Sequence, residues 1–304
     1  MHWQTTRFQI DLTQPKIMGI VNVTPDSFSD GGTHASARDA FVHCEQLIKD
    51  GAHILDIGGE SSRPGAAPLP LDEELARVLP VVRAAVKLGV PVSVDTYKPE
   101  VMRAVLDLGA DIINDIWAFR QPGSALAVAA HPQCGLVLMH MHRDPQTMQI
   151  QPMQEGNGSG ERGASGETGD VVQQVKRQLL LFCELLAHTL YGLEADLPSE
   201  KASTTLQNRI VIDPGIGFGK TVEQNFSLLA RQAELLSLGY PILAGWSRKS
   251  SLGAVTGLDA AERMLPSVAA ALLAVERGAS IVRVHDVRET AQALAVWSAM
   301  KKLL

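Results

Sequence analysis

The stretch GAHILDIGG, residues 51–59, joins the end of a helical pattern to a short apolar strand. Gly51 stands where the helix is expected to stop, because glycine readily takes the left-handed conformation that ends helices. The run after it is nearly continuously apolar, which is typical of a strand buried on both faces. The same order of helix, Gly-Ala and strand recurs at Gly109 and Gly278. The repetition predicts a fold built from one helix–strand unit.

Eight strand-like runs follow one another along the chain, with helical patterns between them. The runs are IMGIVNV (17–23), HILDIGG (53–59), PVSVD (91–95), DIIND (111–115), GLVLMH (135–140), RIVID (209–213), PILAG (241–245) and SIVRVH (280–285). Among the helical patterns are residues 37–52, 73–89 and 260–279. Such alternation predicts an α/β protein with a parallel sheet. Eight units favour a closed (β/α)8 TIM barrel over an open doubly wound sheet, and 304 residues suit one such domain spanning 1–304.

Two segments fall outside the repeat. FQIDL, residues 8–12, predicts a short extra N-terminal strand. The segment EGNGSGERGASGETGD, residues 155–170, has six glycines and almost no apolar side chains. We expect it to be a flexible insertion in the loop after the fifth strand, with a lid as the less favoured alternative.

The charge and composition of the chain exclude several classes of function. A formal net charge of −6 argues against a nucleic-acid partner, so an anionic ligand must be bound by a local cluster of cations or by helix N-termini. No apolar run approaches the roughly 20 residues that a membrane span needs, and the first residues lack the apolar core of a signal peptide. The three cysteines are far apart and predict reduced, buried thiols. We therefore expect a cytoplasmic protein that is not bound to a membrane.

Polar side chains gather where the predicted strands end, and this is the end of a TIM barrel that carries the chemistry. They are Asn22, Ser62, Arg63, Asp95, Asn114, Asp213, Ser247, Arg248, Lys249, Arg283 and His285. A single Asp or Asn at a strand end is more often a helix cap or a turn former than a ligand contact. Capping, however, requires no basic groups. Cations and carboxylates that converge on one barrel mouth predict a substrate with an anionic part and a hydrogen-bonding ring.

Two motifs imitate other kinds of site. DPGIGFGKT, residues 213–221, ends like a phosphate-binding loop, but the first glycine of that motif falls on Pro214, which has no N–H to offer a phosphate. We interpret the stretch as an acid, Asp213, at a strand tip followed by a flexible turn. MHMH, residues 139–142, places His140 and His142 on one face of a strand. A metal site there is the less favoured interpretation, because the sequence shows no further His pair and no obvious carboxylate-bridging lysine.

Taken in order, eight stretches of the chain resemble the dihydropteroate synthase family of folate biosynthesis. They are IMGIVNVTPDSFSDGG (17–32), ILDIGGESSRPGA (54–66), SVDTYKP (93–99), IINDI (112–116), VLMHM (137–141), IDPGIGFGKT (212–221), GWSRKSSLG (245–253) and RVHDV (283–287). The family joins 6-hydroxymethyl-7,8-dihydropterin pyrophosphate to 4-aminobenzoate and releases pyrophosphate, with Mg2+ as cofactor. The resemblance implies this transferase activity, a pterin-binding TIM barrel and a homodimer formed through the late helices.

The resemblance also implies roles for residues of a pterin pocket. Asp213 would accept two hydrogen bonds from the donor edge of the ring, and Asn114 would pair with the ring nitrogens. Lys249 would reach the ring carbonyl and N5, while Arg283 would lie flat on the ring. Asp95 would contact the other side of the ring and stabilise positive charge on it. The walls and the remaining contacts of this pocket would be Ile116, Met139, Phe218 and Gly245.

At the pyrophosphate end, the resemblance implies that Asn22 offers its side-chain oxygen to Mg2+, a hard cation that prefers oxygen ligands and keeps waters. The residues implied to hold the phosphate oxygens are Ser62, Arg63 and His285. Those expected to frame the aminobenzoate are Phe28, Pro64, Ser247 and Lys249. Those implied to be catalytic are Arg63, Asp95 and Lys249. The implied course is SN1-like: pyrophosphate leaves before the arylamine attacks, and no covalent enzyme intermediate forms.

The sequence departs from the family pattern at several positions, and two other functions are alternatives to this interpretation. His142-Arg143-Asp144 replaces a neutral run, the Gly-rich insertion follows it, and Trp246 is bulkier than the usual residue before Ser-Arg-Lys. A methyltetrahydrofolate–corrinoid methyltransferase would share the barrel but has no use for a pyrophosphate site. A pterin-binding paralogue without turnover is the second alternative. The sequence leaves open sulfonamide sensitivity, the dimer interface and whether this is a main or an accessory synthase.

Overall fold

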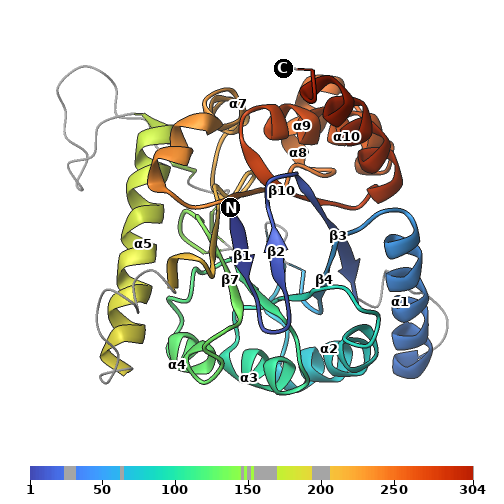
Figure 1. The fold of residues 1–304 in the computed structure, drawn as a ribbon, viewed down its shortest axis with the longest axis vertical. Coiled ribbons are helices and arrows are strands. Elements are labelled where there is room, and N and C mark those ends of the chain that lie inside the picture. The colour runs from blue at the N-terminus through green and yellow to red at the C-terminus, as the bar shows by residue number, and fades with distance from the viewer. Residues whose placement is uncertain are drawn as a thin grey trace.

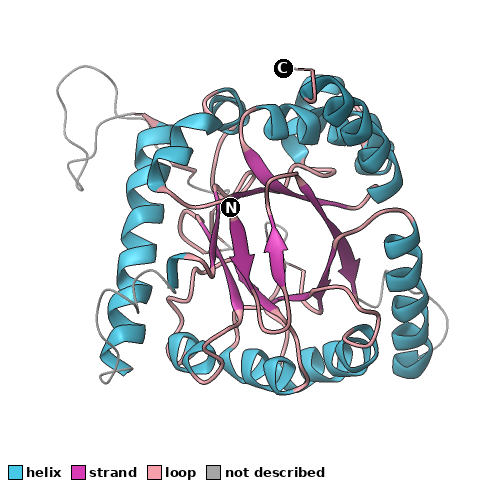
Figure 2. Ribbon diagram, in the orientation of Figure 1, coloured by secondary structure: helices cyan, strands magenta, loops and turns pink. Residues whose placement is uncertain are grey.

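The computed structural model of the chain describes residues 1–23, 32–61, 65–144, 147–148, 152–153, 170–193 and 206–303. In these residues eight parallel strands close into a barrel, and helices surround it (Figure 1). Figure 2 shows the strands as an inner ring and the helices as an outer one. The (β/α)8 TIM barrel predicted from the sequence is confirmed. No helix in these ranges is long and apolar enough to cross a lipid bilayer.

The strands of the barrel follow the predicted runs closely. They are β3 (Lys16–Asn22), β4 (Ile54–Gly58), β5 (Val92–Asp95), β6 (Ile112–Asp115), β7 (Gly135–Met139), β8 (Ile210–Asp213), β9 (Ile242–Ala244) and β10 (Ala279–Val284). Each pairs with the next along the chain, and β10 pairs with β3 to close the ring. The register sets Asp95 beside Asn114 and Met139 beside Asp213. Polar residues at neighbouring strand tips therefore stand at the same height in the barrel.

The helices lie outside the barrel and connect its strands. They are α1 (Gly32–Lys49), α2 (Leu71–Ala85), α3 (Pro99–Asp107), α4 (Ser124–Ala129), α5 (Val171–Leu193), α7 (Val222–Ala230), α8 (Ser250–Thr256), α9 (Met264–Glu276) and α10 (Val287–Lys301). Two 3-10 turns, η2 (Gln232–Leu238) and η3 (Ala260–Glu262), complete the described set. The single helix predicted over 260–279 is divided into η3 and α9, because Asp259 and Glu262 form a capping box around the first turn only. Of the predicted insertion 155–170, only Asp170 lies in the described residues.

A two-stranded antiparallel hairpin, rather than one extra strand, precedes the barrel. Its strands are β1 (His2–Gln4) and β2 (Gln9–Asp11), and Figure 1 shows them within the outline of the strand ring. The sequence predicted β2 but missed β1, because three residues show no measurable alternation. Trp3 is fully buried and its indole Nε1 donates to the carbonyl oxygen of Arg209 at 2.7 Å. The hairpin covers the end of the barrel opposite the polar strand tips.

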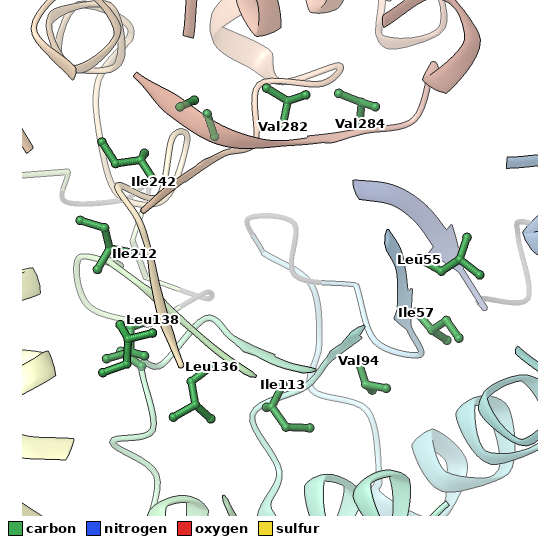
Figure 3. Close-up of a cluster of buried hydrophobic side chains, with 14 of the residues drawn as sticks. Leu55, Ile57, Val94, Ile113, Leu136, Leu138, Ile212, Ile242, Val282 and Val284 are labelled. Carbon is green, nitrogen blue, oxygen red and sulfur yellow. The ribbon is translucent and has the colours of Figure 1, made fainter. Parts of the chain in front are cut away.

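Alternation along each strand divides the interior into two compartments. Side chains facing outward pack under the helices, and Figure 3 shows them pointing away from the barrel axis: Leu55, Ile57, Val94, Ile113, Leu136, Leu138, Ile212, Ile242, Val282 and Val284. Side chains of the other parity face the axis. Near the hairpin these are apolar and cluster with Trp3, namely Met18, Ile54, Ile112, Val137, Val211, Leu243 and Ile281. Two residues further along the strands, the side chains that face the axis are polar: Asp56, Asn114, Asp213 and Arg283. The strands therefore carry a sealed apolar end and a polar end.

Candidate active site

Arg283, on β10, is the centre of the polar end. Its Nη2 donates to Asp95 Oδ2 at 2.7 Å, and its Nε donates to Asp56 Oδ2 at 2.6 Å. Asn114 Nδ2 donates to the same Asp56 oxygen at 3.3 Å. Lys249 interacts electrostatically with Asp213, Arg283 and Asp95. Five predicted site residues, four on strands and Lys249 on the loop before α8, therefore share one barrel mouth.

Burial shifts the proton affinities of these charged groups. Desolvation raises the pKa of Asp95 to about 7, against the opposing effect of Arg283 and with help from the negative charges of Asp56 and Glu74. It also raises the pKa of Asp213, although Lys249 and the Gly215 N–H pull in the other direction. Desolvation lowers the pKa of Lys249 to about 8. Asp95 and Lys249 can therefore change protonation state near neutral pH, which is typical of residues that handle charge during a reaction.

An apolar wall completes the mouth. Ile116 and Met139 pack in one buried cluster with Met141 and Met148, and Phe218 packs against that cluster. The Lys249 ammonium lies 4.9 Å from the centroid of the Phe218 ring and donates to the carbonyl oxygen of Ile216. The site therefore combines an apolar wall with charged groups at its edge, a combination that suits a planar heterocycle.

Gly245 follows β9, at the point where two cations approach. A Cβ placed there would lie 3.7 Å from Lys249 Nζ and 4.0 Å from Arg283 Cβ. Glycine thus leaves room between the two cations at this position.

The rim of the mouth carries Asn22, Ser247 and His285. Asn22 ends β3 and is partly buried. The Ser247 hydroxyl oxygen lies 2.9 Å from His285 Nδ1 and accepts the backbone N–H of His285 at 3.1 Å. The predicted phosphate residue and the predicted aminobenzoate residue therefore touch one another. Arg248, by contrast, pairs with Asp286, its Nη2 2.6 Å from Oδ1.

A cavity of about 260 Å³ opens beside Asp95 and Ile116. Its wall includes Glu60 and Glu74, whose carboxylates both accept hydrogen bonds from Lys98. Thr96 adds a hydrogen bond of 2.6 Å to Glu74. This network ties the segment after β5, which follows Asp95 directly, to α2.

Four predicted site residues lie outside the described part of the chain. They are Phe28, Ser62, Arg63 and Pro64. Their roles at the pyrophosphate and aminobenzoate ends stay predictions.

Known proteins are similar to this chain over almost its whole length. The sequence pattern of the family described as pterin binding enzyme matches residues 18–177 and 193–285. A dihydropteroate synthase of Neisseria meningitidis serogroup B is 46% identical to the chain in an alignment that covers 98% of this chain and 97% of that protein. The chain belongs to the dihydropteroate synthases of the pterin-binding family.

Solved dihydropteroate synthases have the same fold. The Burkholderia cenocepacia enzyme, complexed with 7,8-dihydropteroate, is 45% identical with a TM-score of 0.81 and covers 99% of this chain and 97% of its own. The Xanthomonas albilineans enzyme, with 4-aminobenzoic acid, is 44% identical with a TM-score of 0.79 and covers 96% of this chain and 95% of its own. The activity is therefore that of a dihydropteroate synthase, a transferase, rather than that of a corrinoid methyltransferase.

Two features that depart from this family or imitate other sites point their side chains toward the surrounding helices and not into the mouth. Trp246 is 1% exposed and packs on Phe226, with ring centroids 5.4 Å apart, so it belongs to the layer beneath the helices and not to the entrance. His140 is fully buried, and its Nε2 lies 2.9 Å from Gln178 Oε1. Burial holds the pKa of His140 well below its usual range.

Sequence reasoning missed Asp56, the carboxylate that holds Arg283 and Asn114. A usable signal existed, because Asp56 is an isolated carboxylate inside the apolar run HILDIGG and is fully buried. An acid in the middle of a buried strand requires a partner. The partner, Arg283, is 227 residues away in the sequence, so the pair could not be assigned from spacing.

Asp115 and the Glu74–Lys98 pair were also missed. Asp115 accepts the backbone N–H groups of Trp117 at 2.8 Å and Phe119 at 2.7 Å, and it fixes the turn that presents Ile116. These residues act on neighbours of the site, and a strand-end pattern has no means of identifying such supporting groups.

Proposed function

We propose that this chain condenses 6-hydroxymethyl-7,8-dihydropterin pyrophosphate with 4-aminobenzoate, giving 7,8-dihydropteroate and pyrophosphate by an SN1-like mechanism. One observation carries the proposal: Asp95, Asp213, Lys249 and Arg283 meet in one mouth, in a chain 45% identical to a synthase solved with dihydropteroate. The whole chain, 1–304, would form a single pterin-binding domain.

The pterin would lie in the mouth against Ile116, Met139 and Phe218. Asp213 stands at the tip of β8, where a carboxylate can accept two hydrogen bonds from the 2-amino group and N3–H. Asn114 supplies a donor and an acceptor for ring nitrogens. Lys249 reaches the ring carbonyl and N5, and Arg283 stacks on the ring with its orientation set by Asp56.

The chemistry separates opposite charges. The C–O bond of the exocyclic methylene breaks, the electron pair leaves with pyrophosphate, and a cation delocalised into the pterin remains. Asp95 would stabilise that cation as a carboxylate. The arylamine nitrogen then attacks the methylene and gives up a proton, so no covalent bond to the protein forms. Electrostatic stabilisation of this kind commonly contributes on the order of 3 kcal/mol per contact.

The pyrophosphate would be held at the rim by His285, Ser62 and Arg63. Asn22 ends β3 and can offer one side-chain oxygen, a donor that suits Mg2+ carried with the pyrophosphate and its waters. When bound, Mg2+ would neutralise charge on the leaving pyrophosphate. Arg63 would serve as a catalytic cation for the same charge. The aminobenzoate would enter between Ser247, Lys249, Phe28 and Pro64.

The proposal includes a cytoplasmic location and a homodimeric state for the protein. Its three cysteines are free and buried, as expected in a reducing compartment. The late helices carry exposed apolar side chains, with Leu265 and Val296 each 73% exposed. Exposed apolar side chains on these helices support a dimer through α8, α9 and α10.

The deciding experiment is incorporation of radioactive 4-aminobenzoate into dihydropteroate by the purified protein. Calorimetry with the pterin pyrophosphate, with and without Mg2+, supplies the binding step. We expect turnover and binding that is tighter with Mg2+. Tight binding without incorporation would identify the pterin-binding paralogue instead.

A further inference from the structure

Lys220, from the Gly-Lys-Thr sequence that fails as a phosphate loop, lies in the interior next to the site. The residue is 3% exposed. Its Nζ donates to the carbonyl oxygens of Gly215 at 2.8 Å, Phe218 at 3.2 Å and His140 at 3.4 Å. The lysine therefore binds carbonyl oxygens of its own chain, and the proposed mechanism assigns it no role.

The carbonyls that Lys220 binds belong to two segments. Residues 214–219 form a turn after β8, and His140 follows the end of β7. The two segments are in close contact, since a Cβ on Gly215 would lie 1.8 Å from the His140 carbonyl oxygen. Gly215 has φ of +66°, which favours glycine further. Lys220 thus joins the turn to the neighbouring strand from the inside.

This turn carries three parts of the site. Asp213 precedes it and accepts the Gly215 N–H at 2.7 Å. Phe218 lies within it and forms part of the apolar wall. The Ile216 carbonyl, which accepts Lys249, lies between them. A shift of the turn would therefore move Asp213, Phe218 and the Lys249 ammonium together.

Lys220 also carries charge. Burial and the nearby Lys249 lower its pKa to about 7, while Asp213 opposes that effect. Asp213 is faced by Lys249 at the start of α8, by Arg283 on β10 and by Lys220 from its own turn, and each of these cations lowers its pKa. His140, on the β7 side, is held neutral. Lys220 is therefore one of three cations that oppose protonation of Asp213.

We propose that Lys220 is a positioning residue of the pterin site, which fixes the turn 214–219 and keeps Asp213 ionised to read the donor edge of the pterin. The inference rests on the function proposed above. Its consequence is specific: loss of the Lys220 charge raises the pKa of Asp213, so the acidic pH at which pterin affinity falls moves upward. A role in packing alone would weaken binding without moving that pH.

The test measures the Kd of the pterin pyrophosphate by calorimetry as a function of pH. Lys220→Met should raise Kd about tenfold at neutral pH, as expected for loss of hydrogen bonds from a charged donor. Its acidic limb should lie at higher pH than that of the wild type. Lys220→Gln, which keeps donors for the carbonyls without the charge, should show the same displaced limb even if the Met variant folds poorly. Lys220→Arg should keep the wild-type limb.

Asn225 offers a matched control, because it holds the same turn without any charge. It is 1% exposed, and its Oδ1 accepts the Gly217 N–H at 2.8 Å. Asn225→Ala should raise Kd with an unmoved acidic limb. If Lys220→Gln and Lys220→Met also leave the limb unmoved, the inference is overturned while the proposed function stands. If the wild type does not bind the pterin pyrophosphate, both are overturned.

Discussion

The two ends of the barrel are built from the same strands and differ completely in chemistry. On β4, Ile54 faces the hairpin end and Asp56 faces the mouth; on β10, Ile281 and Arg283 do the same. Only two residues, roughly 7 Å of strand, separate each pair. Strand geometry therefore does not determine which end carries the function. The side chains that face the barrel axis decide which end is sealed and which end reacts.

A buried carboxylate at each end makes the difference clear. At the hairpin end, Asp111 Oδ1 accepts Arg7 Nε at 3.0 Å, and its Oδ2 accepts Arg7 Nη2 at 2.6 Å and the Val92 N–H at 2.9 Å. At the mouth, Asp56 has Arg283 and Asn114 on Oδ2, while its Oδ1 has no hydrogen-bond partner within the described residues. The sealed end satisfies its charges internally. The reacting end leaves the Asp56 Oδ1 atom without a hydrogen-bond partner in the described residues, which lowers stability and leaves a polar atom for binding.

The largest expected effect lies at the sealed end. Trp3→Ala removes a fully buried indole from the apolar layer and should reduce the free energy of unfolding by about 3–5 kcal/mol. Activity per folded molecule should stay within about twofold, because Trp3 is remote from the mouth. Chemical denaturation and the incorporation assay measure the two quantities. Trp3→Phe, which keeps the ring but loses the bond to Arg209, should be intermediate. Lost activity with unchanged stability would contradict the separation of the two ends.

Lys249→Ala and Asp95→Ala test the reacting end. Each should lower kcat/KM at least about a hundredfold, because one electrostatic contact to developing charge is worth on the order of 3 kcal/mol. Neither should lower the melting temperature as Trp3→Ala does, since each removes a desolvated charge with a shifted pKa. Steady-state kinetics and thermal melts on the same samples check this. Near-normal turnover in either variant would refute the assigned role.

Asp56→Asn should have a smaller effect, about tenfold in kcat/KM, because Arg283 keeps Asp95 as a second partner. Loss of the Asp56 charge should also lower the pKa of Asp95, since that charge raises it. The acidic limb of the pH–rate profile should then move to lower pH. Asp111→Asn is the matched change at the other end: it should lower stability and leave the profile where it was.

The smallest expected effect is the pH dependence of kcat/KM in the wild-type protein. Asp95 must be ionised to stabilise the pterin cation, so kcat/KM should rise as pH increases through about 7. Lys249 must be protonated, so kcat/KM should fall as pH increases through about 8. A narrow bell-shaped profile is expected. A rate independent of pH across this range would show that neither group titrates in the working site.

Much of the fold followed from local patterns. The eight strands, the turn after Asp213 and the polar strand tips could be predicted because a run buried on both faces and a glycine after a helix are readable within a few residues. The hairpin strand β1 escaped because it has three residues. The division of 260–279 escaped because its capping box competes with a continuous apolar pattern.

The sequence by itself determined a parallel (β/α)8 barrel and the family's set of acids and cations at the strand tips. Only the tertiary structure decided which of these groups pair with one another. Arg283 finds Asp56 and Asp95 across 227 and 188 residues of chain, and Lys220 turns inward to carbonyl oxygens although its motif resembles a phosphate loop. The physical reason is that hydrogen-bond partners and desolvation depend on distances through space, which close only when the barrel does.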